Sequence, residues 1–126
     1  MEPQRTTTNR RQAVGRYGED VAARYLVDLG WTVLDRNWRG ARGELDIVAL
    51  DGDEVVAVEV KSRTTTAFGH PALAVDGAKL ARVGRLAGQW LTEHAVRAAS
   101  VRVDVLAVVI RGRGPASVEH LRGVQP

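Results

Sequence analysis

The amino-acid sequence predicts an α/β fold in a single domain. The chain has 126 residues, about one domain's worth, and 44% of them are apolar, which suffices for one buried core. Two segments repeat apolar residues every three or four positions, as amphipathic helices do, and β-branched runs mark the strands. The resulting order is one helix, three strands, a second helix and one or two further strands.

The N-terminal third should contain an arm, a helix and a strand. Residues 1–11 are rich in Thr and Arg and are expected to form a disordered basic arm, which leaves 12–126 as the single folded domain. A helix should span residues 12–29, because its apolar residues recur at helical spacing and a glycine suited to ending it follows. Residues 31–37 should form a strand, and residues 38–43 a basic connection.

The same signals predict the remaining elements. They are strands at 44–50 and 54–62, a helix at 78–94, a strand at 101–110 and a short strand at 117–121. The Asp-Gly-Asp segment at 51–53 is a hairpin signal, and a loop should cover 63–71. No internal repeat and no further domain boundary is apparent.

The hairpin geometry indicates which polar side chains face one another. A loop of residues 52–53, with glycine first as a type II′ turn prefers, places Asp46 opposite Glu59. The same register places Glu44 opposite Lys61, and strand alternation puts all four side chains on one face. A loop starting one residue earlier would make Asp46 and Glu59 diagonal neighbours on that face. A three-residue loop would separate them unless a bulge restored the phase.

Three carboxylates on one sheet face repel one another unless a cation lies between them. Mg²⁺ prefers one or two carboxylates together with water and phosphate oxygens, so Asp46 and Glu59 are candidate ligands of Mg²⁺ or Mn²⁺. Lys61 would point to the same side and could stabilise a hydroxide or a pentavalent transition state at phosphorus. The alternative is an ordinary strand pair with one solvated polar face, in which Glu44 and Lys61 form a cross-strand ion pair.

Glu19 is a further candidate on the first helix. It follows Gly18, a residue that costs about 1 kcal/mol inside a helix relative to alanine and that a close backbone approach would explain. Glu19 shares a helical row with Ala22 and Leu26, so it is expected to face the sheet. The alternative is a solvated helix residue.

The charge is distributed unevenly along the chain. Residues 1–11 carry a net charge of +2, residues 12–76 of −4 and residues 77–126 of +5. An acidic middle between basic ends suits a metal centre flanked by surfaces that contact phosphates. The alternative is a surface whose charges are merely solvated. Four residues are candidate nucleic-acid contacts: Arg39, Arg42, Arg63 and Lys79.

The ordered set of these motifs resembles the YraN family, bacterial proteins placed in the PD-(D/E)xK, restriction-endonuclease-like nuclease superfamily. The resemblance covers residues 13 to about 121. The matching pieces are Gly18-Glu19-Asp20, Arg36-Asn37-Trp38-Arg39, Gly43-Glu44-Leu45-Asp46-Ile47-Val48-Ala49, Val58-Glu59-Val60-Lys61-Ser62-Arg63, Phe68-Gly69, Lys79 and Val101-Arg102-Val103-Asp104-Val105.

The resemblance implies a mixed central β-sheet flanked by helices. It also implies metal ligation by Asp46 and Glu59, with Lys61 in the catalytic lysine position. Glu19 matches a helix glutamate that completes the metal environment in Holliday-junction-resolvase-like members. Glu44 belongs to the family signature as a supporting residue.

These observations predict a Mg²⁺- or Mn²⁺-dependent endonuclease that acts on DNA, including branched or flapped DNA. The alternatives are a nucleic-acid-binding module without hydrolysis and a protein-interaction domain. Cysteine is absent and no apolar run is long enough for a membrane span or a secretory signal, so we expect a cytoplasmic protein. Nucleic acid, with DNA in first place, is the expected partner, and a homodimer is left open.

Overall fold

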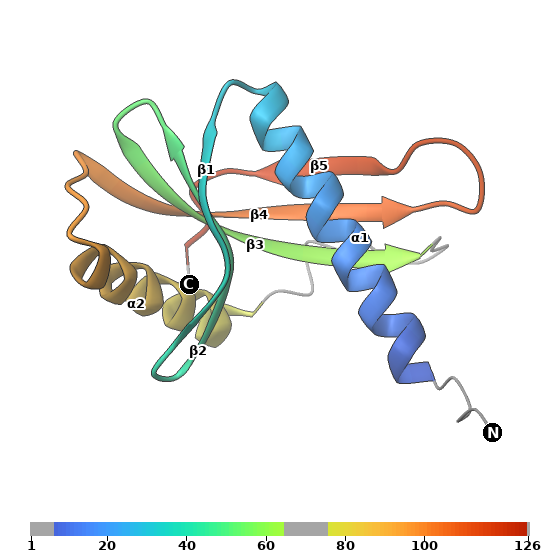
Figure 1. Cartoon of the computed structure of the whole chain (residues 1–126), viewed down its shortest axis with the longest axis horizontal. Helices are drawn as coiled ribbons and strands as arrows, with labels where there is room; N and C mark the ends of the chain where they lie inside the picture. The colour runs from blue at the N-terminus through green and yellow to red at the C-terminus, as the bar shows by residue number, and fades with distance from the viewer. Residues whose placement is uncertain (1–6, 65–75, 126) are drawn as a thin grey trace.

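The computed structural model describes residues 7–64 and 76–125, without the side chains of residues 7–9. Its elements are α1 (Thr7–Asp28), β1 (Thr32–Gly40), β2 (Gly43–Asp51), β3 (Glu54–Thr64), α2 (Gly77–His94), β4 (Ser100–Ile110) and β5 (Ser117–Leu121). The strands form one sheet in the order β1-β2-β3-β4-β5. The two helices cover opposite faces of this sheet, with α1 across the front in Figure 1.

The sheet is mixed because its central pair is parallel. Strands β3 and β4 run in the same direction, while the other three neighbouring pairs are antiparallel. Residues 55–59 of β3 and 104–108 of β4 are buried without interruption, as expected for strands covered on both faces. The chain returns from β3 to β4 through α2. The predicted α/β class with a mixed central sheet is confirmed, and the architecture is consistent with a restriction-endonuclease-like fold.

Each helix contributes one apolar stripe to the core. Helix α1 packs Ala22 and Leu26 against one face of the sheet, together with Trp31 just beyond its end. Helix α2 covers the other face with Val83, Leu86, Ala87 and Trp90. Neither helix in the described part of the chain is long and apolar enough to cross a membrane.

The hairpin register follows the first of the three predicted alternatives. Asp51 pairs with Glu54, and the ladder continues to the Ile47–Val58 pair. Gly52 has a φ of 64°, which glycine adopts without steric cost. The loop therefore consists of residues 52–53, as a glycine-first turn requires.

Two predicted boundaries were wrong. Helix α1 begins at Thr7, so residues 7–11 are helical rather than part of a disordered arm; no glycine or proline interrupts this stretch. Strand β1 extends to Gly40, because its basic end pairs with β2 through a ladder that local composition does not reveal. The rest of the arm, residues 1–6, and most of the predicted loop at 63–71 lie outside the described residues.

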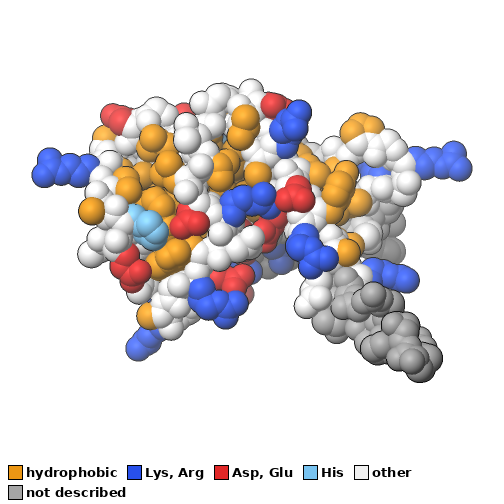
Figure 2. Space-filling model, viewed as in Figure 1, with side chains coloured by type: hydrophobic (Ala, Val, Ile, Leu, Met, Phe, Trp, Pro, Cys, Tyr) orange, Lys and Arg blue, Asp and Glu red, His pale blue; other side chains and the backbone are white. Residues whose placement is uncertain are grey.

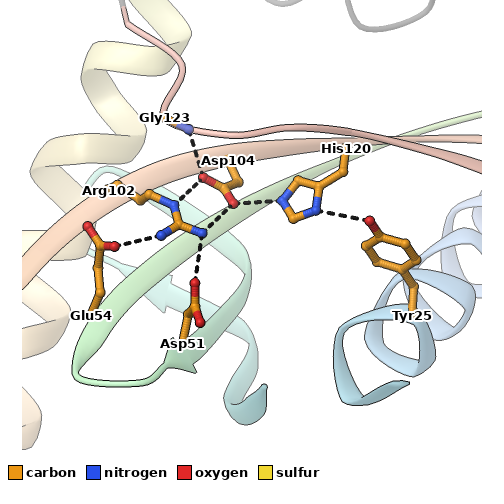
Figure 3. A network of polar contacts seen from close by, with 7 residues as sticks. All are labelled: Tyr25, Asp51, Glu54, Arg102, Asp104, His120 and Gly123. Atoms are coloured by element: carbon orange, nitrogen blue, oxygen red, sulfur yellow. Dashed lines mark hydrogen bonds and ion pairs between the residues drawn. The ribbon is translucent and has the colours of Figure 1, made fainter. Parts of the chain in front are cut away.

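A buried polar network holds β4 to its neighbours (Figure 3). The Asp104 carboxylate is fully buried, and hydrogen-bonding groups from three residues surround it. Arg102 Nε donates at 2.9 Å, the Gly123 backbone N–H at 2.9 Å, and His120 Nε2 lies 2.7 Å away. Beyond His120, its Nδ1 lies 3.1 Å from the Tyr25 hydroxyl, which connects β5 to α1. His120 is thus part of this network.

Arg102 extends the network to the β2–β3 hairpin. Its guanidinium donates to Glu54 at 2.6 Å and to Asp51 at 3.2 Å. Burial by itself would raise the pKa of the Asp104 carboxyl. The hydrogen bonds from Arg102, Gly123 and His120 outweigh burial and hold this pKa below its usual value. Asp104 is therefore charged at neutral pH and fully satisfied, so the network ties five segments of chain together.

We expect Asp104→Asn to lower the free energy of unfolding by roughly 1–3 kcal/mol, because a neutral amide cannot accept from Arg102, Gly123 and His120 as the carboxylate does and leaves a buried donor unsatisfied. Urea denaturation at neutral pH measures this loss. The matched control is Asp28→Asn, which breaks the exposed Arg24–Asp28 pair and should change stability by less than about 1 kcal/mol. Equal losses for the two variants would contradict the role given to the network.

Candidate functional site

The candidate site begins where β1 and β2 change phase together. Leu45 packs on the α2 side of the sheet and Ile47 on the α1 side, although residues two apart in a regular strand share a face. The residue between them is Asp46. Asp46 lies opposite Asn37 of β1, and the strand pairs before and after this position keep the same register. Asn37 adopts a φ of 54°, which is rare for a residue other than glycine. Both strands therefore kink at the position of the predicted metal ligand.

The kink turns the Asp46 carboxylate toward β3. The described ladder between β2 and β3 ends at the Ile47–Val58 pair. Beyond it, Asp46 Oδ2 accepts a hydrogen bond of 2.9 Å from the Val60 backbone N–H. A side chain thus takes the place of a backbone acceptor, and Asp46 lies in the fork where the two strands separate. From there it lines cavities on both sides of the sheet.

The cavity on the α2 side brings Asp46 and Glu59 together. It has a volume of about 310 Å³, and Glu44 also lines it. Glu59 is 5% exposed, and its Oε2 lies 2.7 Å from Lys79 Nζ of α2. The hydrogen bond to Glu59 raises the pKa of Lys79 above its usual value, so the lysine is charged at neutral pH.

The cavity on the α1 side is larger and more basic. It has a volume of about 590 Å³ and contains Glu19 and Asp46 beside three arginines: Arg10, Arg11 and Arg63. Figure 2 shows a hollow between the tip of the β1–β2 hairpin and α1, where acidic and basic side chains gather. Gly18 permits this geometry, because a Cβ there would overlap the Ser62 hydroxyl. The predicted close backbone approach at Gly18 is confirmed, and it is an approach to β3.

Glu19 faces the sheet, as its helical row predicted. Its Oε1 lies 3.9 Å from the Arg36 guanidinium, and it forms a side-chain hydrogen bond with Asn37. Burial raises the pKa of Glu19, and the hydrogen bond from Asn37 and the charge of Arg36 oppose that rise. Asn37 is thus a site residue that the sequence reading missed.

The pKa of the Asp46 carboxyl is strongly raised in this site. Burial, followed by the neighbouring charge of Glu59, raises the pKa of Asp46 to about 7. The Val60 N–H lowers it, the charge of Glu19 raises it, and the charge of Lys79 lowers it. A carboxyl pKa displaced by burial and by like charges is typical of functional sites.

The donor set suits a hydrated Mg²⁺ or Mn²⁺ better than a metal enclosed by protein ligands. Within the described residues, no group of three or more His, Cys, Asp or Glu side chains is arranged to hold a metal ion. Asp46 and Glu59 nevertheless share one cavity and raise each other's electrostatic cost. Two carboxylates are what Mg²⁺ commonly takes from a protein, with water and phosphate oxygens completing its shell. The chemistry of these residues therefore fits such an ion.

The other predicted site residues are placed differently from expectation. Glu44 was expected opposite Lys61, but it forms an exposed ion pair with Arg39 at 3.2 Å. Lys61 pairs with Ala107 in register and is half-buried on the α2 side, two residues beyond Glu59. It is not among the residues that line the cavity of Asp46 and Glu59.

Lys79 takes the position beside Glu59 that was expected for Lys61. It was predicted to contact nucleic acid, whereas its ammonium is paired with Glu59. The order of elements predicts a helix after β3, but no spacing in the sequence brings Lys79 beside Glu59. Arg42 and Arg63 do line cavities, one on each side of the sheet.

Asp46→Asn should change how stability depends on pH. The folded protein keeps the Asp46 proton up to about pH 7, whereas an unfolded Asp loses it near about pH 4. Stability of the parent therefore falls as pH rises through this window, by at most about 1.4 kcal/mol per pH unit from this group. The variant should gain stability over the parent as pH increases toward 7, as measured by urea denaturation. Asp53→Asn, an exposed turn residue, is the control, and a parent–variant difference that stays constant with pH would contradict the assignment.

The two lysines should differ in their effect on stability. Lys79→Met removes the partner of a buried carboxylate and should cost roughly 1–3 kcal/mol. Lys61→Met should cost less than about 0.5 kcal/mol, because the described residues offer its ammonium no ion pair. Denaturation of both variants in parallel tests this difference, and a larger loss for Lys61→Met would reverse the two roles.

Comparison with known proteins places the chain in a family. The model of the uncharacterised protein family UPF0102 matches residues 18–108. A UPF0102 protein of Beutenbergia cavernae is 55% identical over 114 residues, which cover 90% of this chain and 97% of the relative. A UPF0102 protein of Arthrobacter sp. (strain FB24) is 55% identical over 111 residues, covering 88% and 94%. A UPF0102 protein of Streptomyces griseus is 49% identical over 117 residues, covering 92% and 98%. The chain therefore belongs to the UPF0102 family, the YraN family that its motifs resemble.

Proposed function

We propose that this protein is a Mg²⁺- or Mn²⁺-dependent nuclease that hydrolyses phosphodiester bonds in DNA. One observation carries the proposal. Two carboxylates from neighbouring strands, Asp46 and Glu59, line a single cavity at the fork of the sheet, and the pKa of Asp46 is raised to about 7. Such a repulsive pair stores an electrostatic cost that a divalent cation would remove.

Asp46 and Glu59 would hold the ion, and Glu19 would complete its surroundings from the α1 side. When bound, the ion polarises a phosphodiester oxygen and lowers the pKa of a coordinated water. Asp46 is oriented for this role by the Val60 N–H, which fixes one of its two oxygens and leaves the other available. Asn37 and Arg36 orient Glu19 in the same way.

The lysines of the site would act on charge that develops at phosphorus. Lys79 Nζ already lies in the cavity, and an incoming phosphate would compete with Glu59 for it. By its resemblance to the superfamily motif, Lys61 would be the catalytic lysine, and it follows Glu59 by two residues along β3. A cation fixed beside the scissile group stabilises the transition state more than the ground state.

The arginines of the α1-side cavity support a polyanionic substrate. Arg10, Arg11 and Arg63 surround the cavity that Asp46 reaches from the fork, and Arg63 continues the strand that carries Glu59. Contacts of this kind position a nucleic-acid backbone without reading its sequence. We therefore expect cleavage that depends on the structure of the substrate more than on its bases.

A nucleic-acid-binding protein without hydrolysis is the second candidate. The Lys79–Glu59 ion pair favours it, because a carboxylate that is already neutralised binds a metal ion less readily. The two candidates differ in whether Asp46 and Glu59 respond to Mg²⁺ or Mn²⁺.

We expect the purified protein to cleave DNA with Mn²⁺ or Mg²⁺ and not with a chelator. The assay should offer single-stranded, duplex, flap and four-way-junction DNA, with melting temperature measured on the same samples. Asp46→Asn and Glu59→Gln should lose both cleavage and the thermal stabilisation by metal. Lys61→Ala should lose cleavage on the order of a hundredfold or more and keep the metal response.

Asp53→Asn is the matched control and should behave as the parent does in both measurements. Cleavage that persists in Glu59→Gln would rule out Glu59 as a ligand. Salt-sensitive DNA binding with no cleavage of any substrate, and no response to metal, would favour the binding protein over the nuclease. If Lys79→Met alone abolished cleavage, the catalytic ammonium would come from α2.

A further inference from the structure

A second basic cavity lies on the α2 side, next to the cavity of Asp46 and Glu59. It is formed between the tip of the β1–β2 hairpin and the outer surface of α2, and its volume is about 590 Å³. The residues that line it are Ala41, Arg42, Arg82, Arg85, Leu86 and Gln89. Arg82 and Leu86 also line the cavity that contains the two carboxylates, so the two hollows adjoin.

The cavity depends on a close fit between the hairpin and the helix. Gln89 Oε1 accepts a hydrogen bond of 3.4 Å from the Ala41 backbone N–H, which holds the turn against α2. Gln89 is itself held by Glu93, to which its Nε2 donates at 2.8 Å. A Cβ at Gly43, whose φ is 149°, would lie 3.3 Å from Leu86 and 3.6 Å from Arg82. The position of Arg42 relative to the helix is therefore fixed by contacts on both sides of the turn.

Three arginines line this cavity, and none of them forms an ion pair with a carboxylate of the described residues. In the described part of the chain, Arg42, Arg82 and Arg85 form no ion pair, whereas Arg36 and Arg39 each pair with a carboxylate. Unpaired like charges around one hollow favour an anion that can accept several hydrogen bonds. Phosphate has this property, and the planar guanidinium matches it with two parallel donors.

We infer that this cavity holds a backbone phosphate of the nucleic acid adjacent to the phosphate that faces Asp46. The inference rests on the proposed function and names a binding site for its substrate. A polynucleotide repeats its phosphates along one chain. One phosphate can therefore occupy the arginine cavity while the next phosphate occupies the adjoining cavity of Asp46 and Glu59, because Arg82 lines both cavities. An isolated anion would not need two adjoining cavities.

The test compares two variants that each remove two positive charges. Arg82→Gln with Arg85→Gln alters the cavity. Arg97→Gln with Arg113→Gln alters exposed arginines that do not line it. Binding of a fluorescein-labelled single-stranded oligonucleotide is followed by anisotropy over a series of salt concentrations, with a chelator present so that no cleavage occurs.

The cavity variant should bind more weakly and show a smaller salt dependence. Losing two phosphate contacts reduces the slope of log affinity against log salt by about 1.4 for a single strand. The control variant should keep the slope of the parent. Arg42→Gln, a single change on the turn, should reduce the slope by about half as much and serves if the double variant fails to fold.

An unchanged slope in the cavity variant would overturn the inference, and so would an equal loss in the control variant, which would indicate a general field effect. The outcomes are separable from those of the nuclease proposal. Cavity-dependent binding without any cleavage would contradict the nuclease alone. Metal-dependent cleavage with cavity-independent binding would contradict the phosphate site alone.

Discussion

The parallel pairing of β3 with β4 is the constraint on which the rest of the molecule depends. Parallel neighbours cannot be joined by a hairpin, so the chain must cross over, and α2 makes that crossing. The helix begins at Gly77 after Asp76, whose side chain accepts a hydrogen bond of 2.8 Å from the Lys79 backbone N–H. Lys79 then lies over β3 and meets Glu59. The crossover that closes the core thus also supplies the counter-charge of the candidate site.

A second constraint is local and lies at Asn37 and Asp46. Both strands shift phase at this point, and Asn37 adopts a left-handed conformation that costs free energy in residues other than glycine. The shift lets Leu45 and Ile47 pack on opposite faces, so neither side of the core loses an apolar contact. It also frees the Asp46 carboxylate to bind the Val60 N–H and to reach both sides of the sheet. Backbone strain of this kind is concentrated at functional positions.

Two acidic clusters in the described residues differ in how their charge is balanced. Asp104 is completely buried, yet its pKa is lowered, because Arg102, Gly123 and His120 satisfy it. The pKa of Asp46 is raised to about 7 by burial and by the neighbouring charges of Glu59 and Glu19, which the Val60 N–H and Lys79 offset only in part. A network whose charges are balanced stabilises a fold, whereas carboxyl groups with a strongly raised pKa are typical of functional sites. This contrast distinguishes the candidate site from the structural network of Figure 3.

Much of this arrangement is determined by the sequence alone. The order of helices and strands follows from apolar periodicity, and the hairpin register follows from Gly52, because both depend on neighbours a few residues apart. The choice of Asp46 and Glu59 as candidate carboxylates followed from the same register. Only the tertiary structure decided that Lys79 meets Glu59, that Arg39 takes Glu44, and that β1 and β2 kink together. Those contacts join residues whose separation depends on the crossover and on how both faces of the sheet are filled, and no local periodicity in the sequence records that packing.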